Sequence, residues 1–366
     1  MSCMCIILSV ILTIMNTSPK KTFITIILTL GCLTLFIIFS SLSTAHAATS
    51  CPNGTTLNIV AHEDDDLLFL SPDLFHNIQA GKCIVTVFVT SGDANGSSFY
   101  WLGRENGSKA AYAQMAGVSN SWTQNDAGLT GHPIPIFNLD NNSTVSLIFM
   151  RLPDGNVNGS GFPNNNNESL QKIWQSGITT IHPVDGSSSY TKQDIINSLT
   201  FIINIYQPDK INTQDFVGSY NDGDHSDHHT TAYFAQAANQ SYPKLHTFTA
   251  YLGYPISSLP INVLGNDAIA KQNAFLAYAP YDLSVCQTLS YCQLVDYGQW
   301  LVRQYTNGGP TPTPISPNIA SQAVVTASTQ STQDNQLAVK TVDGFIDGYP
   351  GDYTHEWATL GKKSGA

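Results

Sequence analysis

The feature that most limits the fold is an alternation between short apolar runs and longer segments of helical pattern, from residue 48 to about 306. Parallel strands need crossover connections long enough to hold a helix, so this alternation favours an α/β domain. We therefore predict a Rossmann-like, mainly parallel sheet with helices on both faces. The Asn- and Gly-rich segment 141–168 is predicted to be a long loop beside that core. The predicted strands are 56–61, 83–91, 134–139, 210–214 and 246–253, and the predicted helices are 66–80, 104–117, 191–206 and 226–240.

The stretch NGGPTPTPISP, residues 307–317, marks a domain boundary, because a Pro- and Thr-rich sequence cannot join a sheet interior and behaves as a semi-rigid spacer. It separates the predicted α/β domain, 48–306, from a tail, 318–366, that is short for an independent core. The tail runs from NIA through VDG to WAT and resembles the opening of a discoidin-like carbohydrate-binding β-sandwich. That resemblance implies a partial β-sandwich that is poorly ordered by itself.

Residues 1–47 have the features of an export signal. Lys20 and Lys21 precede the apolar run 23–41, and an A-x-A pattern ends at Ala47. We expect cleavage there and a secreted or cell-surface protein, with Met15 as an alternative start. A retained anchor is the alternative, because the apolar run approaches the ~20 residues that span a bilayer. The uncleaved segment would then be the membrane contact.

Cysteine usage agrees with an oxidising compartment, because four cysteines, an even number, follow the predicted signal. Cys51 precedes one predicted strand and Cys83 begins the next, so these two can form a bridge if the strands are neighbours. Cys286 and Cys292 could close a small local loop. All three pairings of the four cysteines remain open at this point. A zinc-thiolate site is disfavoured, because no C-x-x-C pair occurs.

Charge is scarce in this chain: 11% of the residues are charged, and the formal net charge is −11. Nucleic-acid binding needs clustered Lys and Arg, and no such cluster follows Lys21, so no nucleic-acid partner is expected. The sequence predicts no particular oligomeric state. Because charge is scarce, the two places where it gathers are informative.

The first such place is AHEDDD, residues 61–66, directly after a predicted strand. Ligands of parallel α/β sheets bind at the carboxyl ends of the strands, which is where this run begins. The simpler interpretation is a helix N-terminus, where each acidic side chain gains about 0.3–1 kcal/mol from the helix dipole.

The second place is NDGDHSDHH, residues 221–229, which also follows a predicted strand. His225 and His228 are three residues apart at the start of a predicted helix, so they share a face, whereas His229 points elsewhere. A calcium loop is the alternative, but histidine is a poor calcium ligand and the EF-hand spacing is missing. Together the clusters offer imidazole nitrogens and carboxylate oxygens, which favours a catalytic divalent metal, most simply zinc with three protein ligands and a water.

These clusters carry a resemblance to the PIG-L/LmbE-like de-N-acetylases. AHEDDD is similar to the family's A-H-P-D-D-E motif, and HSDH (225–228) is similar to its H-P-D-H motif. VTVFVTSGDANG, an Arg-Glu helix start, LPDG (152–155) and PDKINTQD resemble further motifs in the family's order, so that the resemblance spans residues 56–255. The chain departs from the family at Glu63 and Ser226, where proline is usual, and at Asp66, where glutamate is usual.

The resemblance implies one zinc ion per chain, with iron(II) as the alternative metal. Its implied ligands are His62, Asp65 and His228. Arg104 and Asp154 match positions that face the substrate in the family. An ion pair between Arg104 and its neighbour Glu105 is the simpler interpretation of that arginine.

The resemblance also implies the catalytic residues. Asp64 would be the general base that takes a proton from the attacking water. His225 would stabilise the oxyanion and protonate the leaving amine, and Asp227 would orient His225. Asp66 could equally serve only the loop structure.

The function predicted from these residues is an exported zinc-dependent deacetylase. It would hydrolyse the N-acetyl amide of an N-acetylglucosamine-type sugar or glycoconjugate to an amine and acetate. One alternative is a carbohydrate-binding protein whose deacetylase-like domain is catalytically impaired. Another is a metal-dependent esterase or lactonase that uses the same site.

Overall fold

The computed structural model describes residues 51–307, 324–333 and 335–342. The predicted export signal, most of the predicted spacer and much of the tail lie outside the described residues. Among those that are described, no helix has both the length and the hydropathy of a bilayer-spanning segment.

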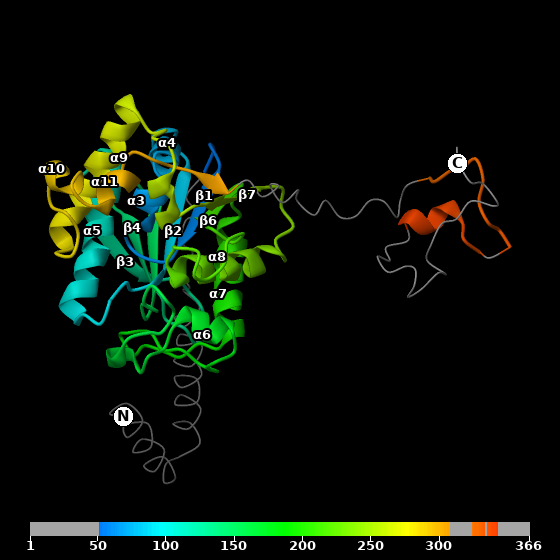
Figure 1. Cartoon of the computed structure of the whole chain (residues 1–366), viewed down its shortest axis with the longest axis horizontal. Coiled ribbons are helices and arrows are strands. Elements are labelled where there is room, and N and C mark those ends of the chain that lie inside the picture. Colours follow the sequence, from blue (N-terminus) through cyan, green and yellow to red (C-terminus); the bar gives the residue numbers. More distant parts are fainter. Residues whose placement is uncertain (1–50, 308–323, 334, 343–366) are drawn as a thin grey trace, which may run out of the picture. The chain divides into compact units, whose positions relative to one another are not determined.

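An eight-stranded sheet lies at the centre of the α/β domain, in the order β3-β4-β5-β2-β1-β6-β7-β8 (Figure 1). The central strands pair in parallel, β5 with β2, β2 with β1, β1 with β6 and β6 with β7. β4 runs antiparallel to β3 and to β5, and β8 runs antiparallel to β7. The predicted mainly parallel sheet is therefore confirmed. The strands are β1 (Thr55–Val60), β2 (Cys83–Thr90), β3 (Trp122–Asp126), β4 (Pro135–Leu139), β5 (Val145–Leu152), β6 (Lys210–Gln214), β7 (Thr247–Tyr251) and β8 (Thr306–Asn307).

Helices cover both faces of this sheet, as predicted (Figure 1). Successive residues of a strand point to opposite faces, and β1 accordingly sends Leu57 and Ile59 into one apolar core and Val60 into the other. The first core packs against α6, α7 and α8, and the second against α3, α4, α5 and α9. The helices are α3 (Asp65–Phe69), α4 (Asp73–Gln79), α5 (Ser98–Ala116), α6 (Leu170–Trp174), α7 (Lys192–Tyr206), α8 (Ser226–Asn239), α9 (Gly265–Tyr278), α10 (Leu289–Cys292) and α11 (Asp296–Trp300).

Two predicted elements differ in the structure. The helix predicted over 66–80 is interrupted between α3 and α4, because Pro72 has no backbone N–H to continue the helical hydrogen bonds. The loop predicted over 141–168 contains β5, a buried strand paired with β2 near the middle of the sheet. Its apolar run VSLIFMRL pairs inside the sheet, whereas the Asn- and Gly-rich residues that suggested a loop follow it.

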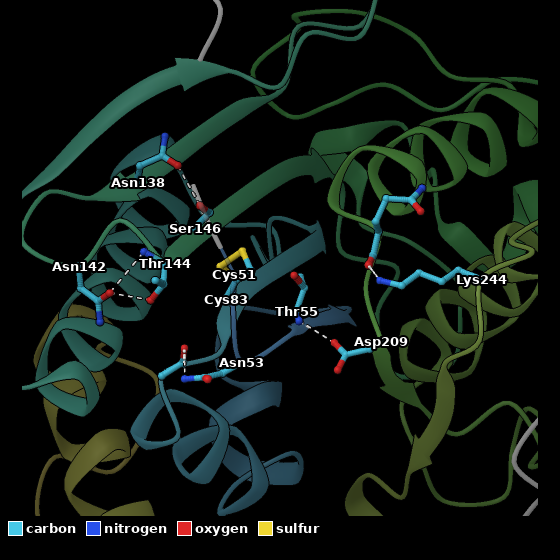
Figure 2. Close-up of a disulfide and its surroundings, with 12 residues drawn as sticks. Cys51, Asn53, Thr55, Cys83, Asn138, Asn142, Thr144, Ser146, Asp209 and Lys244 are labelled. Carbon is cyan, nitrogen blue, oxygen red and sulfur yellow. Dashed lines mark hydrogen bonds between the residues drawn. A yellow bond between two sulfur atoms is a disulfide. The ribbon is translucent and has the colours of Figure 1, made fainter. Parts of the chain in front are cut away.

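Two disulfides join the cysteine pairs that the sequence made feasible, Cys51 with Cys83 and Cys286 with Cys292. The first ties the residues before β1 to the start of β2, at the amino ends of the two central strands (Figure 2). At the same end of the sheet, Asp209 accepts a hydrogen bond from the backbone N–H of Thr55 at 2.6 Å (Figure 2). The disulfide and this hydrogen bond thus tie the amino end of β1 to β2 and to the residue before β6.

The described part of the tail contains little regular structure. Ser331 and Gln336 form an isolated β-bridge, and a 3-10 helix spans Ala338–Val342. The rest of the predicted β-sandwich lies outside the described residues.

Candidate metal and catalytic centre

A cavity of about 110 Å³ lies at the carboxyl ends of β1 and β6. The chain leaves β1 for β2 on one side and later returns to β6 on the other, so the two strands flank a topological switch point, where ligands of α/β sheets bind. The residues after β1 contribute His62, Asp64 and Asp65 to the cavity wall, and the residue before α8 contributes His225. The two sequence clusters therefore meet at one site.

His62, Asp65 and His228 form the innermost group, with candidate ligand atoms that all lie within 4.8 Å of one another. The carboxylate of Asp65 lies between the two rings: Oδ2 is 3.1 Å from His62 Nδ1, and Oδ1 is 3.0 Å from His228 Nε2. All three side chains are buried. The structure thus brings together the three predicted metal ligands.

The hydrogen bonding of His228 fits a metal ligand. Its Nδ1 lies 2.7 Å from Oδ1 of Asp224, which holds the hydrogen on Nδ1 and leaves a lone pair on Nε2. The Nε2 atoms of His62 and His228 are buried and have no hydrogen-bond partner among the described residues. Without a cation, burial disfavours a charged ring, but Asp65 and Asp224 outweigh it and raise the pKa of His228 to about 10, so a cation bound at Nε2 would take the place of a proton. The donor set of two imidazoles and one carboxylate suits zinc.

Asp64, the predicted general base, lies in the cavity wall beside Arg104. Its Oδ1 accepts a hydrogen bond of 2.6 Å from Nη2 of that arginine. Burial raises the pKa of the Asp64 carboxyl, although the positive charge of Arg104 opposes the shift. Asp64 is therefore held in place while its basicity is increased.

Arg104 itself is buried and surrounded by protein acceptors. Besides Asp64, it donates to the backbone oxygen of Gly92 at 2.7 Å and to the hydroxyl of Tyr278 at 2.8 Å. The simpler interpretation, an ion pair with Glu105, is wrong, because Glu105 pairs instead with Arg151 at 2.7 Å. Arg104 lines the cavity, and its contacts make it the group that positions Asp64; its predicted contact with a substrate remains a prediction.

His225 lies at the N-terminal end of α8, where its Nδ1 accepts the backbone N–H of Asp227 at 3.1 Å. A neutral ring therefore carries its hydrogen on Nε2, which lies 3.8 Å from Oδ1 of Asp154 in the cavity. Burial and the neighbouring histidines hold the pKa of His225 well below its usual value. His225 is thus a neutral hydrogen-bond donor at the cavity wall.

Asp227 orients His225 in a different way from the predicted one. Its backbone N–H bonds to the His225 ring, whereas its carboxylate lies 3.8 Å from that ring and 3.4 Å from His62 Nε2. Asp227 also accepts the backbone N–H of Gly155 at 2.7 Å. A methyl group on Gly155 would lie 2.5 Å from the other carboxylate oxygen, which explains a glycine in the LPDG loop.

The other acids of AHEDDD lie away from the cavity. Asp66 is buried and accepts hydrogen bonds from the hydroxyl of Tyr112 and the backbone N–H of Leu67. Burial raises the pKa of Asp66 to about 8. Glu63 faces Arg104, with Oε2 3.5 Å from Nε, and burial raises its pKa well above the usual range. Through its hydrogen bond from Tyr112 of α5, Asp66 holds α3 against that helix, whereas Glu63 faces the arginine that holds Asp64.

Part of the cavity wall comes from residues that the sequence did not single out. Tyr254, Tyr297 and Trp300 line it together with Asp282 and Ser284. The rings of Tyr254 and Trp300 stack with their centroids 4.8 Å apart. These residues follow the last motif that resembles the family, so no motif pointed to them. The aromatic content of the segment was the one available signal.

Two other residues that support the site were also missed. Asp224 holds His228 and lies within the second cluster, in the loop just before α8, so the acidic character of that cluster was the available signal. Asp93 accepts the backbone N–H of Asp154 at 2.9 Å and lies in the turn after β2. Among the aromatics near Arg104, Tyr100 lines the cavity, whereas Phe99 is exposed and Trp101 is buried against Arg151.

The fold and this site together define the class: an α/β protein with a buried histidine–carboxylate centre, suited to a divalent cation, at the switch point of its sheet. The chain belongs to the GlcNAc-PI de-N-acetylase (PIG-L) family, whose model matches residues 57–239, half of the chain. Deacetylases of this family are hydrolases that act on N-acetyl amides. A second family model, Domain of unknown function (DUF7402), matches residues 318–366, and the discoidin-like resemblance of the tail is not supported.

Several solved structures are similar to this chain. A deacetylase of the teicoplanin biosynthesis pathway is 14% identical, with a TM-score of 0.40 over 66% of this chain and 90% of that one. N,N'-diacetylchitobiose deacetylase from Pyrococcus horikoshii is 12% identical, with a TM-score of 0.37 over 76% and 96%. GalB, the 4-carboxy-2-hydroxymuconate hydratase from Pseudomonas putida KT2440, is 12% identical, with a TM-score of 0.38 over 68% and 82%. No curated protein matches the chain.

Proposed function

We propose that this chain is an exported zinc-dependent deacetylase that hydrolyses the N-acetyl amide of an N-acetylglucosamine-type sugar or glycoconjugate. The observation that carries the proposal is the convergence of His62, Asp65 and His228 beside a small polar cavity in a member of a de-N-acetylase family. Export is supported by the signal-like sequence of residues 1–47 and by two disulfides in the folded domain.

Zinc would be held by His62, Asp65 and His228, with iron(II) as the alternative metal. Zinc bound there would lower the pKa of a water molecule to about 7 and so make a nucleophile available at neutral pH. The protein contributes the rest of the reaction through residues in the cavity wall.

Asp64 is the residue placed to take the proton of the attacking water. Arg104 holds one of its oxygens at the cavity wall, so the carboxylate needs no rearrangement before reaction. Burial raises the pKa of Asp64 towards the range in which a carboxylate is an effective base near neutral pH.

His225 is the residue placed to stabilise negative charge on the amide oxygen. Its neutral ring presents Nε2–H to the cavity, because Nδ1 is occupied by the backbone N–H of Asp227. A fixed donor of this kind commonly contributes about 10²–10³ in rate. Because this ring is held neutral, it stabilises charge without supplying a proton, and the proton that Asp64 takes from the water passes on to the leaving amine.

The cavity wall supports a small acyl group on a sugar. A volume of about 110 Å³ suits acetyl better than a long acyl chain. Tyr254, Tyr297 and Trp300 give an aromatic wall on which the apolar face of a sugar ring can pack. Asp154 also lines the cavity and can accept a hydrogen bond from a sugar hydroxyl.

The proposal is tested by incubating the purified protein with a panel of N-acetylglucosamine glycosides and measuring released acetate and amine. Zinc-loaded protein should release both in equal amounts, a chelator should stop the release, and added zinc should restore it. Release only from O-acetyl esters or lactones would favour the esterase alternative. Glycan binding without any release would favour the impaired binding protein.

A further inference from the structure

A second group of metal-type side chains lies outside the cavity. It consists of Asp215, Asp222 and His229, whose candidate ligand atoms lie within 4.8 Å of one another. Asp215 and Asp222 belong to the loop 215–225 between β6 and α8, and His229 is in the first turns of α8. The same loop carries Asp224 and His225 to the first centre.

The ring of His229 directs one nitrogen at this group. Its Nδ1 donates to the backbone oxygen of Asp215 at 2.8 Å, because a carbonyl oxygen can only accept. Its Nε2 lies 3.0 Å from the carboxylate oxygen Oδ1 of Asp222, so these two potential ligand atoms face each other. The ring is fully buried, so water does not reach it freely.

The two carboxylates converge on one point beside Gly218. A methyl group built on Gly218 would lie 2.6 Å from Oδ2 of both Asp215 and Asp222, and 2.7 Å from Cε1 of His229. Backbone N–H groups fix both acids: Asp215 accepts from Val217 at 2.8 Å, and Asp222 accepts from Ser219 at 3.2 Å. The chain thus leaves space, without a side chain, where two negative charges and a ring meet.

Among the described residues, the one ion pair of these acids is that between His229 and Asp222. Within the part of the chain that the structure describes, no Lys or Arg forms an ion pair with Asp215 or Asp222. Asp215 is almost fully buried, and its other side-chain contact is the neutral amide of Asn307 at 3.0 Å. Asp222 is about one-third exposed, which gives an ion and its water ligands a route from solvent.

We propose that Asp215, Asp222 and His229 form a second divalent-cation site, separate from the catalytic centre, that takes zinc. One imidazole nitrogen and two carboxylate oxygens are ligands that zinc accepts, and water can complete the coordination on the open side. A cation there holds the loop 215–225 against α8. It therefore stabilises the segment that supplies Asp224 and His225, without touching the substrate.

Metal counting on the full-length protein tests the site. The protein is stripped with a chelator, reloaded with zinc, freed of excess ion by gel filtration and measured by elemental mass spectrometry. Wild type should retain two zinc ions per chain, and Asp222→Asn should retain one. Asp222 is chosen because it is partly exposed, so its isosteric change leaves the core intact.

Two further variants separate this site from the catalytic centre. His62→Ala should also retain one ion, and the double variant with Asp222→Asn should retain none. Asp267→Asn is the matched control, because Asp267 also pairs with a histidine, His76, at 2.8 Å but on the surface, and it should retain two ions.

A second readout does not depend on activity. Zinc should raise the thermal unfolding temperature of His62→Ala, and it should leave that of the double variant unchanged. The proposal is overturned if wild type retains one ion and His62→Ala none, or if Asp222→Asn retains two. If His62→Ala retains two ions, the ligand assignment of the proposed catalytic centre fails while the second site stands.

Discussion

The junction after β1 and the junction after β6 both deliver histidine and aspartate to one site, but they are built differently. The first is short: β1 ends at Val60 and α3 begins at Asp65, and the residues between them are buried. The second is the longer loop 215–225, whose residues 221–223 are exposed. The first junction is fixed by the strand that precedes it, whereas the second must be held by its own side chains.

This difference shows in the hydrogen bonds. After β1, Asp65 accepts from the backbone of His62 at 2.6 Å, so one ligand orients another directly. After β6, Asp224 accepts from the backbone of His225 at 2.9 Å and holds the ring of His228 at 2.7 Å. A buried carboxylate that is not itself a ligand therefore sets the geometry of the second junction. The predictions below test this contrast.

The largest effect is expected from removing the ligand of the second junction, His228→Ala. The catalytic centre should lose its ion, so metal content should fall by one ion per chain and acetate release should fall below detection. Elemental mass spectrometry and an acetate assay measure the two quantities. His76→Ala is the control, because His76 is an exposed histidine paired with Asp267. Full metal content and activity in His228→Ala would remove this histidine from the ligand set.

A change in the first junction, Asp64→Asn, should separate chemistry from metal binding. Loss of the general base should lower turnover by about 10²–10⁴, and metal content should stay unchanged. Glu63→Gln is the matched control: it is the neighbouring isosteric change, it faces the same Arg104, and it does not line the cavity. Its effect on turnover should be far smaller. Loss of metal in Asp64→Asn would make Asp64 a ligand.

The supporting carboxylate of the second junction should have a smaller effect. Asp224→Asn should weaken zinc binding at the catalytic centre by about 10–100-fold, because outer carboxylates orient the ligating ring. Competition with a chelator of known affinity measures the change. Asp267→Asn should not alter the affinity. Unchanged affinity in Asp224→Asn would show that the helix alone orients His228.

The smallest effect is expected from the contact between the LPDG loop and α8. Gly155→Ala should lower the free energy of unfolding by about 1–3 kcal/mol, because the new methyl group would lie 2.5 Å from Asp227 Oδ1. Urea denaturation measures the change. At Gly177 the nearest atoms would be 3.4–3.9 Å away, so Gly177→Ala is a control without this clash.

Much of the fold follows from local patterns. The apolar runs at 56–61 and 83–91 predict two central strands, because strands buried on both faces of a parallel sheet are rich in apolar residues. The helix α7 begins at Lys192, one residue after its predicted start. Thr191 and Asp194 form a capping box there. The strand β5 was missed because Asn- and Gly-rich residues flank it. Over the whole segment 141–168 their number outweighed the apolar run at 145–152.

The residues of the site likewise fall into those that local sequence predicts and those that it does not. The resemblance of two short motifs to those of the family singles out His62, Asp65 and His228, and each motif is a run of neighbouring residues. Arg104 is different: its partners come from two segments far from it in the sequence, Asp64 before α3 and Tyr278 and Asp282 at and after the end of α9, and no local pattern links them to it. The aromatic wall from Tyr254 to Trp300 likewise depends on how the chain after β7 folds back.

The sequence by itself determined the class of sheet, the ends of strands at which a site could form, and the donor atoms available there. Only the tertiary structure decided that the extra acid Glu63 faces Arg104, that Asp224 holds His228, and that His229 turns away towards a second pair of acids. The physical reason is the distance along the sequence over which each effect acts. Periodicity and capping act over a few residues. Charge pairing and burial act between residues that are close only after the chain has folded.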